Sequence, residues 1–196
     1  MKITINTKEL LTATQSVVGV VEKKQTMPIL GHILFEMKKN KAFLTATDLE
    51  VQIKSYAKLE TEATSEFSFT VSGRKLYDII RSLNDETVDL QIKNEKLNIT
   101  TKKSKYKLAT MSPQEFPVFD DKKAQDSLNI GQTELLEIIA KTQFAMAQQD
   151  VRFYLNGLLL EIGPNKITAV ATDGHRLAKA TAEIEKGSIT DTSFIL

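Results

Sequence analysis

An acid, an imidazole and a guanidinium stand close together late in the chain, as Asp173, His175 and Arg176. If they lay on one strand, Asp173 and His175 would point to the same face, and a proton relay between them would be feasible. No serine or cysteine nucleophile motif and no phosphate-binding loop accompanies the pair. We therefore do not expect an enzyme, and Asp173-Gly174 indicates instead a tight turn between two strands.

Composition excludes several other kinds of site. The 196 residues include no cysteine and only two histidines, His32 and His175, which are far apart. Disulfides and thiolate chemistry are thereby excluded, and neither a metal nor another cofactor is expected. With 26 basic and 25 acidic residues the net charge is +1, so any contact with nucleic acid must be local. The N-terminus has no apolar run long enough for a signal peptide or a membrane span, which favours a cytoplasmic protein.

The elements that must position these residues occur twice. Residues 3–60 resemble residues 128–185 at a constant shift of 125 positions, and Ala46-Thr47-Asp48 coincides with Ala171-Thr172-Asp173. Further identities flank this match in the same register: Glu9-Leu10-Leu11 with Glu134-Leu135-Leu136, Glu36 with Glu161, Lys41 with Lys166, Ala57 with Ala182, and Glu60 with Glu185. The alternative is coincidence among common residues, but a match of three in register with both flanks favours a duplicated unit.

Both copies show the same order of secondary-structure signals. Asn6 or Thr7 can cap a first helix, whose apolar stripe is Leu10, Ala13, Thr14, Val17 and Val21. In the second copy Glu134 lies in the first turn, and the stripe is Leu135, Ile138 and Ile139. A hairpin follows each helix, 33–37 with 42–47 and 158–162 with 167–172, with short polar turns between the strands.

The first copy continues beyond the repeated part. A strand containing Phe67, Phe69 and Val71 is followed by a helix that Ser72 can cap, with Leu76, Ile79, Ile80 and Leu83 on one face. Alternating strands then run through 88–92, 97–99 and 106–108, with a turn at Asn94-Glu95. One unit therefore has about 120 residues, an ordinary size for a domain.

The proline-containing stretch 112–127 indicates a connection between the units. We divide the chain into a first domain at 1–120, a linker at 121–127 and a partial second domain at 128–196. The second copy lacks counterparts of the second helix and the last strands, and a unit that ends in mid-sheet would expose strand edges. The chain is therefore expected to be a fragment. The predicted fold class is α+β, with repeated domains of two helices packed on antiparallel sheets and a truncated second copy.

Two motifs resemble a known family: Gln149-Asp150-Val151-Arg152-Phe153-Tyr154-Leu155-Asn156-Gly157 and Thr172-Asp173-Gly174-His175-Arg176-Leu177. Together they are similar to the second domain of the bacterial sliding DNA clamp, the beta subunit of DNA polymerase III. Met27-Pro28-Ile29-Leu30, Ala46-Thr47-Asp48-Leu49-Glu50 and Glu115-Phe116-Pro117 resemble its first domain. The resemblance covers the whole chain, but the family's third domain and the end of its second are absent.

The resemblance implies a DNA-clamp fold and a processivity factor for the replicative polymerase. A head-to-tail homodimer would close a ring of six domains, with helices lining a hole for double-stranded DNA. The implied partners are duplex DNA bound without sequence preference, the polymerase III alpha subunit, the clamp loader and other clamp-binding proteins. Without a third domain, this chain is expected to close no ring and to bind client proteins poorly.

The resemblance also implies roles for particular residues. Lys24, Arg74 and Gln149 would lie nearest the DNA and contact only its backbone. A hydrophobic cleft for short client peptides would contain Arg152, Tyr154, Leu155, Thr172, Gly174, His175, Arg176 and Leu177. A late strand carrying Lys103, Lys105, Tyr106 and Leu108 would form the edge that meets the other subunit.

Each set of residues also has a simpler interpretation. Charged residues on helices commonly form a solvated surface. Tyr154 and Leu155 can be core residues of a strand, and lysines on an edge strand prevent unwanted pairing. The alternative function is therefore a β-rich protein-interaction module that does not bind DNA.

Overall fold

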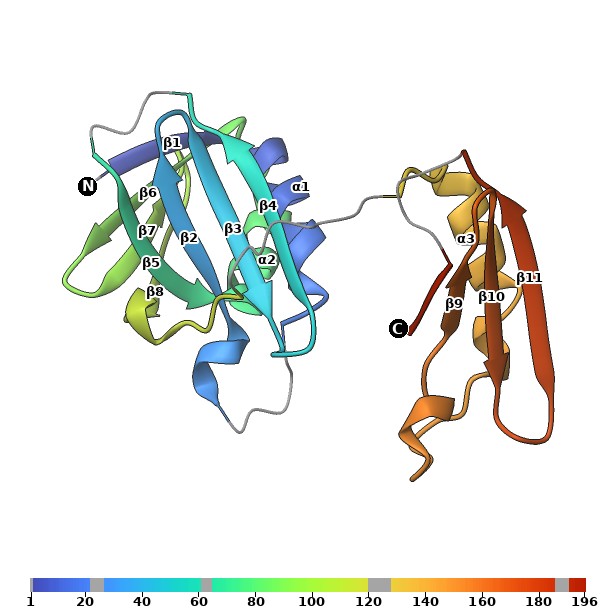
Figure 1. The fold of residues 1–196 in the computed structure, drawn as a ribbon. Coiled ribbons are helices and arrows are strands. Elements are labelled where there is room, and N and C mark those ends of the chain that lie inside the picture. The colour runs from blue at the N-terminus through green and yellow to red at the C-terminus, as the bar shows by residue number, and fades with distance from the viewer. Residues whose placement is uncertain (1, 22–26, 61–64, 120–127, 186–190) are drawn as a thin grey trace. The chain divides into compact units, whose positions relative to one another are not determined.

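The computed structural model describes residues 2–21, 27–60, 65–119, 128–185 and 191–196. The chain forms two compact units, Met1–Asp120 (unit 1) and Asp121–Leu196 (unit 2) (Figure 1). Lys24 and the expected linker at 121–127 lie outside the described residues. Each unit is described by itself.

Unit 1 is built on antiparallel strands. In chain order these are β1 (Lys2–Asn6), β2 (His32–Lys38), β3 (Lys41–Thr47), β4 (Gln52–Lys58), β5 (Phe67–Ser72), β6 (Thr87–Lys93), β7 (Lys96–Thr100) and β8 (Lys105–Met111). They pair in the order β1-β6-β7-β8-β5-β2-β3-β4. A bridge between Ile5 and Leu59 joins the two ends of this order, so the strands curve around one core.

Two helices pack on the inner face of this sheet. α1 (Thr7–Val18) begins as predicted, because the Asn6 side chain accepts hydrogen bonds from the amides of Lys8 and Glu9. α2 (Gly73–Ser82) follows Ser72, but the Ser72 side chain makes no capping hydrogen bond. The predicted stripe of α1 was too long at its end, since Val21 is buried but lies beyond the last helical residue.

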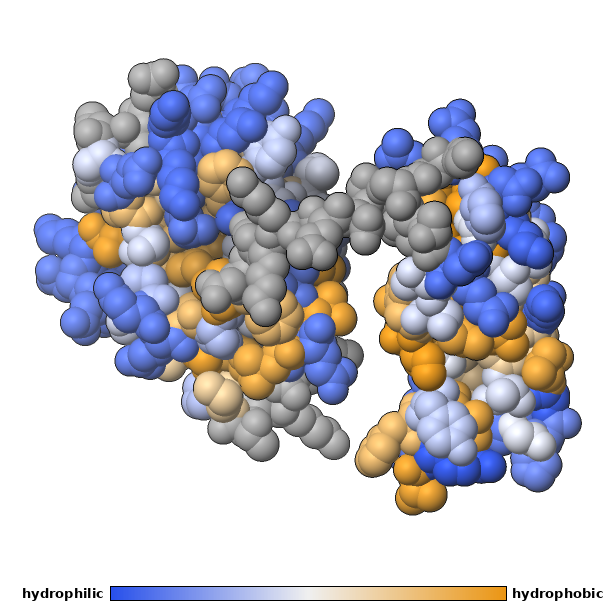
Figure 2. Space-filling model, viewed as in Figure 1, coloured by the Kyte–Doolittle hydropathy of each residue, from blue (hydrophilic) through white to orange (hydrophobic). Residues whose placement is uncertain are grey.

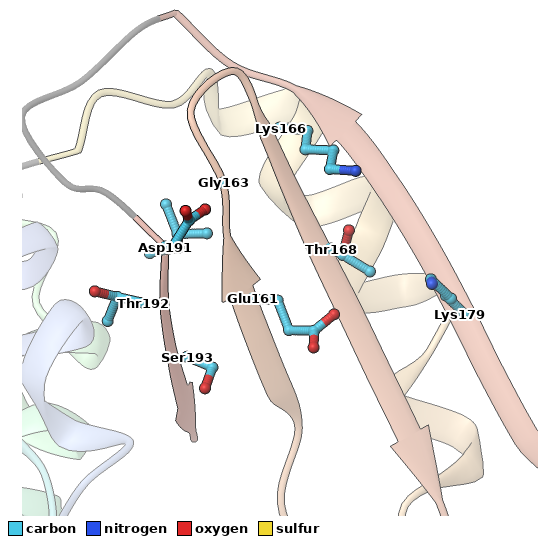
Figure 3. A pocket seen from close by; sticks show the side chains of 9 residues that line it. Glu161, Gly163, Lys166, Thr168, Lys179, Asp191, Thr192 and Ser193 are labelled. Carbon is cyan, nitrogen blue, oxygen red and sulfur yellow. The ribbon is translucent and has the colours of Figure 1, made fainter.

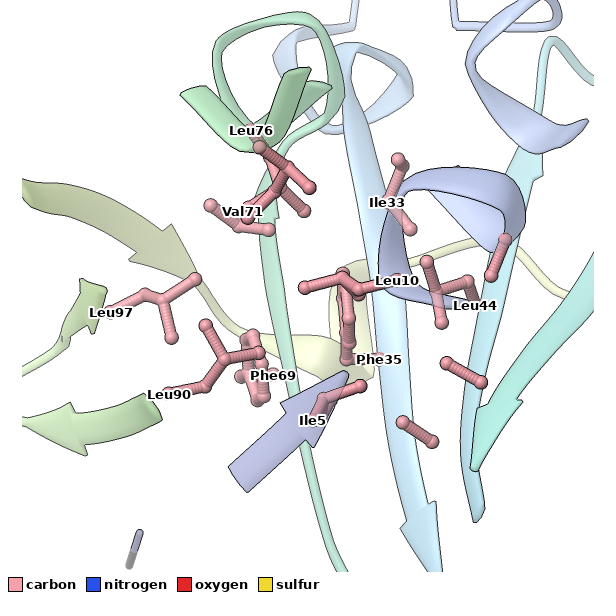
Figure 4. Packing of buried hydrophobic residues seen from close by; sticks show 14 of the residues in the cluster. Ile5, Leu10, Ile33, Phe35, Leu44, Phe69, Val71, Leu76, Leu90 and Leu97 are labelled. Atoms are coloured by element: carbon pink, nitrogen blue, oxygen red, sulfur yellow. The ribbon is translucent and has the colours of Figure 1, made fainter. Parts of the chain in front are cut away.

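The core of unit 1 combines strand and helix side chains. Leu10 of α1 and Leu76 of α2 meet strand residues such as Ile33 and Val71 (Figure 4). The Phe35 and Phe69 rings of adjacent strands stack with centroids 4.9 Å apart. Each such buried side chain contributes about 1.5–3 kcal/mol, and together they hold both helices on one face of the sheet. On the other face, Leu34 of β2 is buried in a second cluster with Ile29, Leu30 and Phe116.

Unit 2 repeats part of this arrangement. It contains α3 (Gln132–Ala140), β9 (Leu159–Ile162), β10 (Lys166–Thr172), β11 (Leu177–Glu183) and β12 (Thr192–Ile195), with the sheet order β11-β10-β9-β12. Its core includes Ile138 of α3 packed against strand residues such as Leu160 and Ile167. The α+β class and the antiparallel sheets are as predicted. None of the described helices is both long and apolar enough to span a membrane.

The strand pairing of the two units has the same register at the shift of 125 residues. Phe35 opposite Leu44 corresponds to Leu160 opposite Ala169, and Thr47 opposite Gln52 corresponds to Thr172 opposite Leu177. The predicted duplication of the helix and the hairpin is therefore confirmed. It also extends further than predicted, because β12 pairs with β9 as β5 pairs with β2.

The first strand of unit 1, β1, has no counterpart in the described part of unit 2. β1 pairs with β6, whereas residues 128–131 form no strand. The position that would correspond to β6 falls after residue 196.

Candidate functional site

The turn between β10 and β11 is held by its own side chains. The Asp173 Oδ1 accepts hydrogen bonds from the amides of His175 (2.9 Å) and Arg176 (3.0 Å), and its Oδ2 accepts one from Arg176 Nε (2.9 Å). The Thr172 hydroxyl donates to the Arg176 carbonyl at 2.7 Å and accepts from the Gly174 amide. Gly174 has φ +90°, a conformation that favours glycine. The predicted tight turn is confirmed.

These contacts also correct the arrangement considered for acid–base chemistry. Asp173 and His175 lie in the turn and not on a strand, so they do not share a strand face. Hydrogen bonds from the amides of His175 and Arg176 lower the pKa of Asp173. Its carboxylate is therefore a turn-forming group that stays ionised, and a proton relay to His175 has no geometric support.

A second loop lies at residues 149–156. Asp150 receives two side-chain hydrogen bonds from Arg152, at 3.0 Å from Nε and 2.8 Å from Nη2, and one from the Arg152 amide. Asn156 closes the loop, because its Oδ1 accepts from the Asp150 amide and its Nδ2 donates to the Asp150 carbonyl, both at 2.9 Å. Gln149, at the start of the loop, has φ +57°. The side-chain hydrogen bonds from Arg152 lower the pKa of Asp150 to about 2.

The loop and the turn line one open pocket of about 700 Å³. Its lining comprises Gln143, Phe144, Met146, Ala147, Gln148, Gln149, Asp150, Arg152, Asp173, His175 and Arg176. The Arg176 guanidinium lies 5.8 Å from the centre of the Phe144 ring, and Arg152 Nη1 would be 3.4 Å from a Cβ placed on Gly174. Each arginine is also paired with an aspartate of the same lining, so charged groups of both signs and an aromatic ring face one space. This combination suits a ligand with both polar and apolar groups.

Of the eight residues expected to form a peptide cleft, three line this pocket: Arg152, His175 and Arg176. Leu177 is 66% exposed and Leu155 is buried. The interpretation of Tyr154 and Leu155 as strand residues was wrong, because both lie in a short 3-10 helix, η4 (Phe153–Leu155). Tyr154 is mostly exposed there.

Sequence reasoning missed several residues of this region. Phe144 and Met146 line the pocket, and the neighbouring Val151 and Phe153 are 87% and 84% exposed. At the lower tip of unit 2, Figure 2 shows hydrophobic residues beside hydrophilic ones. The available signal was the apolar composition of 151–155 without helical or strand periodicity. Large apolar side chains exposed this close together in the chain are typical of an interaction site.

The residues expected near DNA are in different parts of the chain. Arg74 is exposed in the first turn of α2, where its Nη2 donates a 3.0 Å hydrogen bond to the Val21 carbonyl. Gln149 belongs to the loop of unit 2 and lines the pocket. Lys24 is among the residues that the structure leaves undescribed.

The residues expected at a subunit edge are only partly on a strand. β8 begins at Lys105, so the placement of Lys103 on a strand was wrong: it lies in the turn at 101–104, where its amide donates to the Thr101 hydroxyl. Tyr106 and Leu108 are half-buried against the core. In the described structure β8 pairs with β7 along 105–109 and with β5 only at Thr110 and Met111. Most of β8 therefore has one free edge within the described unit, although it lies inside the sheet order.

No three His, Cys, Asp or Glu side chains of the described ranges come together in a way that could hold a metal ion. The pocket itself offers ion pairs, hydrogen-bonding groups and an aromatic ring. Such a site is suited to binding a peptide or another small polar and apolar segment.

Comparison with known proteins identifies the family to which these two units are similar. Residues 1–120 match the family model of the DNA polymerase III beta subunit, N-terminal domain, and residues 129–196 match that of the central domain. The beta sliding clamp of Pseudomonas putida is 42% identical over 179 residues, which are 91% of this chain and 48% of that protein. The beta sliding clamp of Vibrio cholerae is 40% identical over 185 residues, 94% of this chain and 50% of that protein.

Solved structures agree with the sequence matches. The DNA polymerase III subunit beta of Pseudomonas aeruginosa matches with a TM-score of 0.92 and 37% identity, covering all of this chain and 53% of that chain. The beta subunit of Thermotoga maritima matches with a TM-score of 0.89 and 30% identity, covering 100% and 52%. The chain spans about half the length of the curated relatives it matches. Its two units, their order and their fold show that the chain belongs to the DNA polymerase III beta subunit family, the sliding clamps.

Proposed function

We propose that this chain supplies the first domain and part of the second domain of a sliding clamp, which encircles duplex DNA and tethers the replicative polymerase in the cytoplasm. The observation that carries the proposal is the duplicated unit with conserved strand register, in a chain that matches both clamp domains in order. The proposed role is to hold proteins on DNA, without chemistry of its own.

In this role the protein stays on DNA because its ring is closed around the duplex, and tight binding is not needed. A closed ring cannot leave DNA sideways, so it needs only weak contacts with phosphates. Each neutralised phosphate of duplex DNA adds about 0.9 to the logarithmic salt slope, so many contacts would pin the ring. A chain with a net charge of +1 suits sliding, and Lys24, Arg74 and Gln149 are the proposed contacts with the DNA backbone.

The proposed client site combines the eight predicted cleft residues with the pocket of unit 2. Arg152, His175 and Arg176 provide polar groups, while Leu177 and Tyr154 offer exposed apolar surface beside them. A client leucine or phenylalanine buried there would contribute about 1.5–3 kcal/mol. The clients would be short motifs of the polymerase III alpha subunit, the clamp loader and other clamp-binding proteins.

The proposed homodimer contact uses the free edge of β8. Tyr106 and Leu108 provide apolar surface, and Lys103 and Lys105 provide charge. Unpaired strand edges readily accept a strand from another chain, so a head-to-tail partner would complete the pairing of this strand. If the lysines of β8 only protect its edge from unwanted pairing, no partner strand is expected there.

Primer extension tests the proposal. The complete gene product that carries this sequence is added to its replicative polymerase and clamp loader on a primed circular template, with a trap for released polymerase. Longer products are expected with the protein than without it. Leu177→Lys should remove the gain, because it buries a charge in the client site. Val51→Lys makes a similar change in the corresponding turn of unit 1 and should keep it.

Unchanged product length with the unaltered protein would contradict tethering. Equal losses from Leu177→Lys and Val51→Lys would contradict the proposed place of the client site. If the protein binds client peptides but does not remain on DNA, the alternative function of a β-rich interaction module is favoured.

A further inference from the structure

Three lysines stand directly opposite one another on the outer face of unit 1. Lys38 of β2 is paired with Lys41 of β3, and Lys41 is paired with Lys58 of β4. They alternate with the buried residues Met37 and Ala42, so they lie on the face opposite α1 and α2. Like charges directly opposite each other destabilise a sheet. This row of lysines therefore needs a reason other than stability.

Aromatic rings occupy the next row of the same face. Glu36, Phe43 and Tyr56 are cross-strand partners, and the two rings are 6.1 Å apart. Lys41 Nζ lies 4.0 Å from the centre of the Tyr56 ring, and Lys54 Nζ lies 5.5 Å from that of Phe43. Tyr56 is 50% exposed. We call the set Lys38, Lys41, Phe43, Lys54, Tyr56 and Lys58 the lysine–aromatic face.

Acidic residues neutralise this face only in part. Glu36 contacts Lys38 at 3.0 Å and Lys54 at 3.8 Å. At the edge of the sheet, the Glu9 carboxylate accepts a hydrogen bond from the Lys58 amide. Four lysines share the face with Glu36, which contacts only two of them, so the net charge of the face favours an anionic partner.

Unit 2 provides an internal comparison at the corresponding positions. Lys38 and Lys58 are replaced by Gly163 and Glu183, whereas Lys41 is kept as Lys166. The rings are replaced by Thr168 and Thr181, whose hydroxyls are 3.2 Å apart. Figure 3 shows Gly163, Lys166 and Thr168 on this face of unit 2. Unit 2 keeps lysines at the positions of Lys41 and Lys54, as Lys166 and Lys179 (Figure 3), so Lys38, Lys58 and the two rings are the features that distinguish the face of unit 1.

We propose that the lysine–aromatic face binds single-stranded nucleic acid without sequence preference. Neighbouring strands are about 4.8 Å apart, so the lysines form a continuous cationic row that can follow a phosphate backbone. Exposed aromatic rings beside such a row are the usual platform for stacked bases. Lys41 would move from the Tyr56 ring to a phosphate as a base takes its place on the ring.

The alternative partner, an acidic peptide, would use the lysines but not the rings. The proposed surface is also separate from the helical side to which the clamp role assigns duplex DNA. The proposal of single-stranded nucleic-acid binding therefore does not depend on the clamp role, and either proposal can be wrong without the other.

Fluorescence anisotropy of labelled oligothymidylate and oligouridylate with the chain Met1–Leu196 tests the proposal at low salt. Lys41→Gln and Lys58→Gln should each weaken binding and lower the logarithmic salt slope by about 0.7. Tyr56→Thr, which copies unit 2, should weaken binding roughly tenfold, and Tyr56→Phe should not. If oligothymidylate binds more tightly, single-stranded DNA is the preferred ligand; if oligouridylate binds more tightly, RNA is preferred.

Matched controls keep the test independent of folding. Lys166→Gln makes the Lys41 change in unit 2 and should not weaken binding. Lys58→Glu, which copies Glu183, should reduce binding and yet raise the Tm, because it replaces a like-charge pair with an opposite pair. A Tm below that of the unaltered chain would contradict the proposed conflict between stability and binding.

The proposal is overturned if the chain binds neither oligomer, or if Lys166→Gln weakens binding as much as Lys41→Gln. It is also overturned if Tyr56→Thr has no effect while oligoglutamate binds equally well, which would identify an acidic peptide as the partner.

Discussion

At the scale of single residues, Gly174 has the strictest conformational requirement in the client-site turn. Its φ is +90°, and an added Cβ would come within 3.4 Å of Arg152 Nη1. The corresponding residue of unit 1, Leu49, has φ +77°, so both copies need this unusual backbone. The turn geometry is thus set by the duplicated fold, and glycine adopts it with the least strain.

Gly174→Ala should lower the free energy of unfolding by about 1 kcal/mol, because alanine is strained at positive φ. Urea unfolding of the chain measures this loss. Leu49→Gly is the matched reverse change and should not destabilise unit 1 by as much. A Gly174→Ala variant as stable as the unaltered chain would contradict the described backbone.

The carboxyl group of Asp150 should have an unusually low pKa. Its side-chain hydrogen bonds with Arg152 depress its pKa to about 2 from an ordinary 3.8. The stabilising contribution of a depressed carboxyl is present above the unfolded value and is lost as pH falls through the folded value. The loop should therefore persist at pH 4 and lose this contribution between about pH 3.8 and 2.

Carboxyl NMR signals measured against pH check this titration directly. In the Arg152→Gln variant the midpoint should move back towards the ordinary value. A midpoint near 3.8 in the unaltered chain would mean that the Asp150–Arg152 pair does not form in solution.

At the scale of elements, the strands with clear alternation and the capped first helix were predictable. Apolar residues alternate in the sequence of β6 and β7, and the same residues are buried in the structure. The Asn6 cap is likewise a local sequence feature that is present in the structure. β12 was not predicted, because Thr192-Ser193-Phe194-Ile195 has weak alternation and forms a strand only by pairing with β9. The 3-10 helix of Tyr154 was also missed, since three residues are too few for a periodic signal.

Gly157 tests how β12 is held in the sheet. An added Cβ would lie 2.3 Å from the Ile195 side chain and 2.6 Å from the Leu196 carbonyl. Gly157→Ala should therefore loosen the paired hydrogen bonds between Leu158 and Leu196, which are both 2.9 Å. Amide exchange at Leu196 should become faster, while Ala180 of β11 should be unaffected.

Gly163→Ala is the control for this experiment. Its added Cβ would meet nothing closer than 3.5 Å, an ordinary contact. If both alanine variants change exchange at Leu196 equally, the close packing of Gly157 against β12 is wrong.

At the scale of the whole molecule, the duplication was visible in the sequence because identities kept one register over both flanks. The candidate site was less predictable. Arg152, His175 and Arg176 line one pocket, but Phe144 and Met146 join them from a segment whose spacing carries no motif. Side chains brought together by tertiary packing leave no local pattern, so their contribution could not be inferred from the chain alone.

The proposed clamp role rests on encirclement, in which a weakly charged protein stays on DNA because the ring is closed. Retention on circular DNA tests this claim most directly. The complete gene product that carries this sequence is loaded onto a nicked circular duplex, and the complex is isolated by gel filtration before and after one restriction cut. Encirclement predicts that the protein stays with the circle at moderate salt and is lost once the DNA is linear. Equal retention on circular and linear DNA, or none on either, would contradict it.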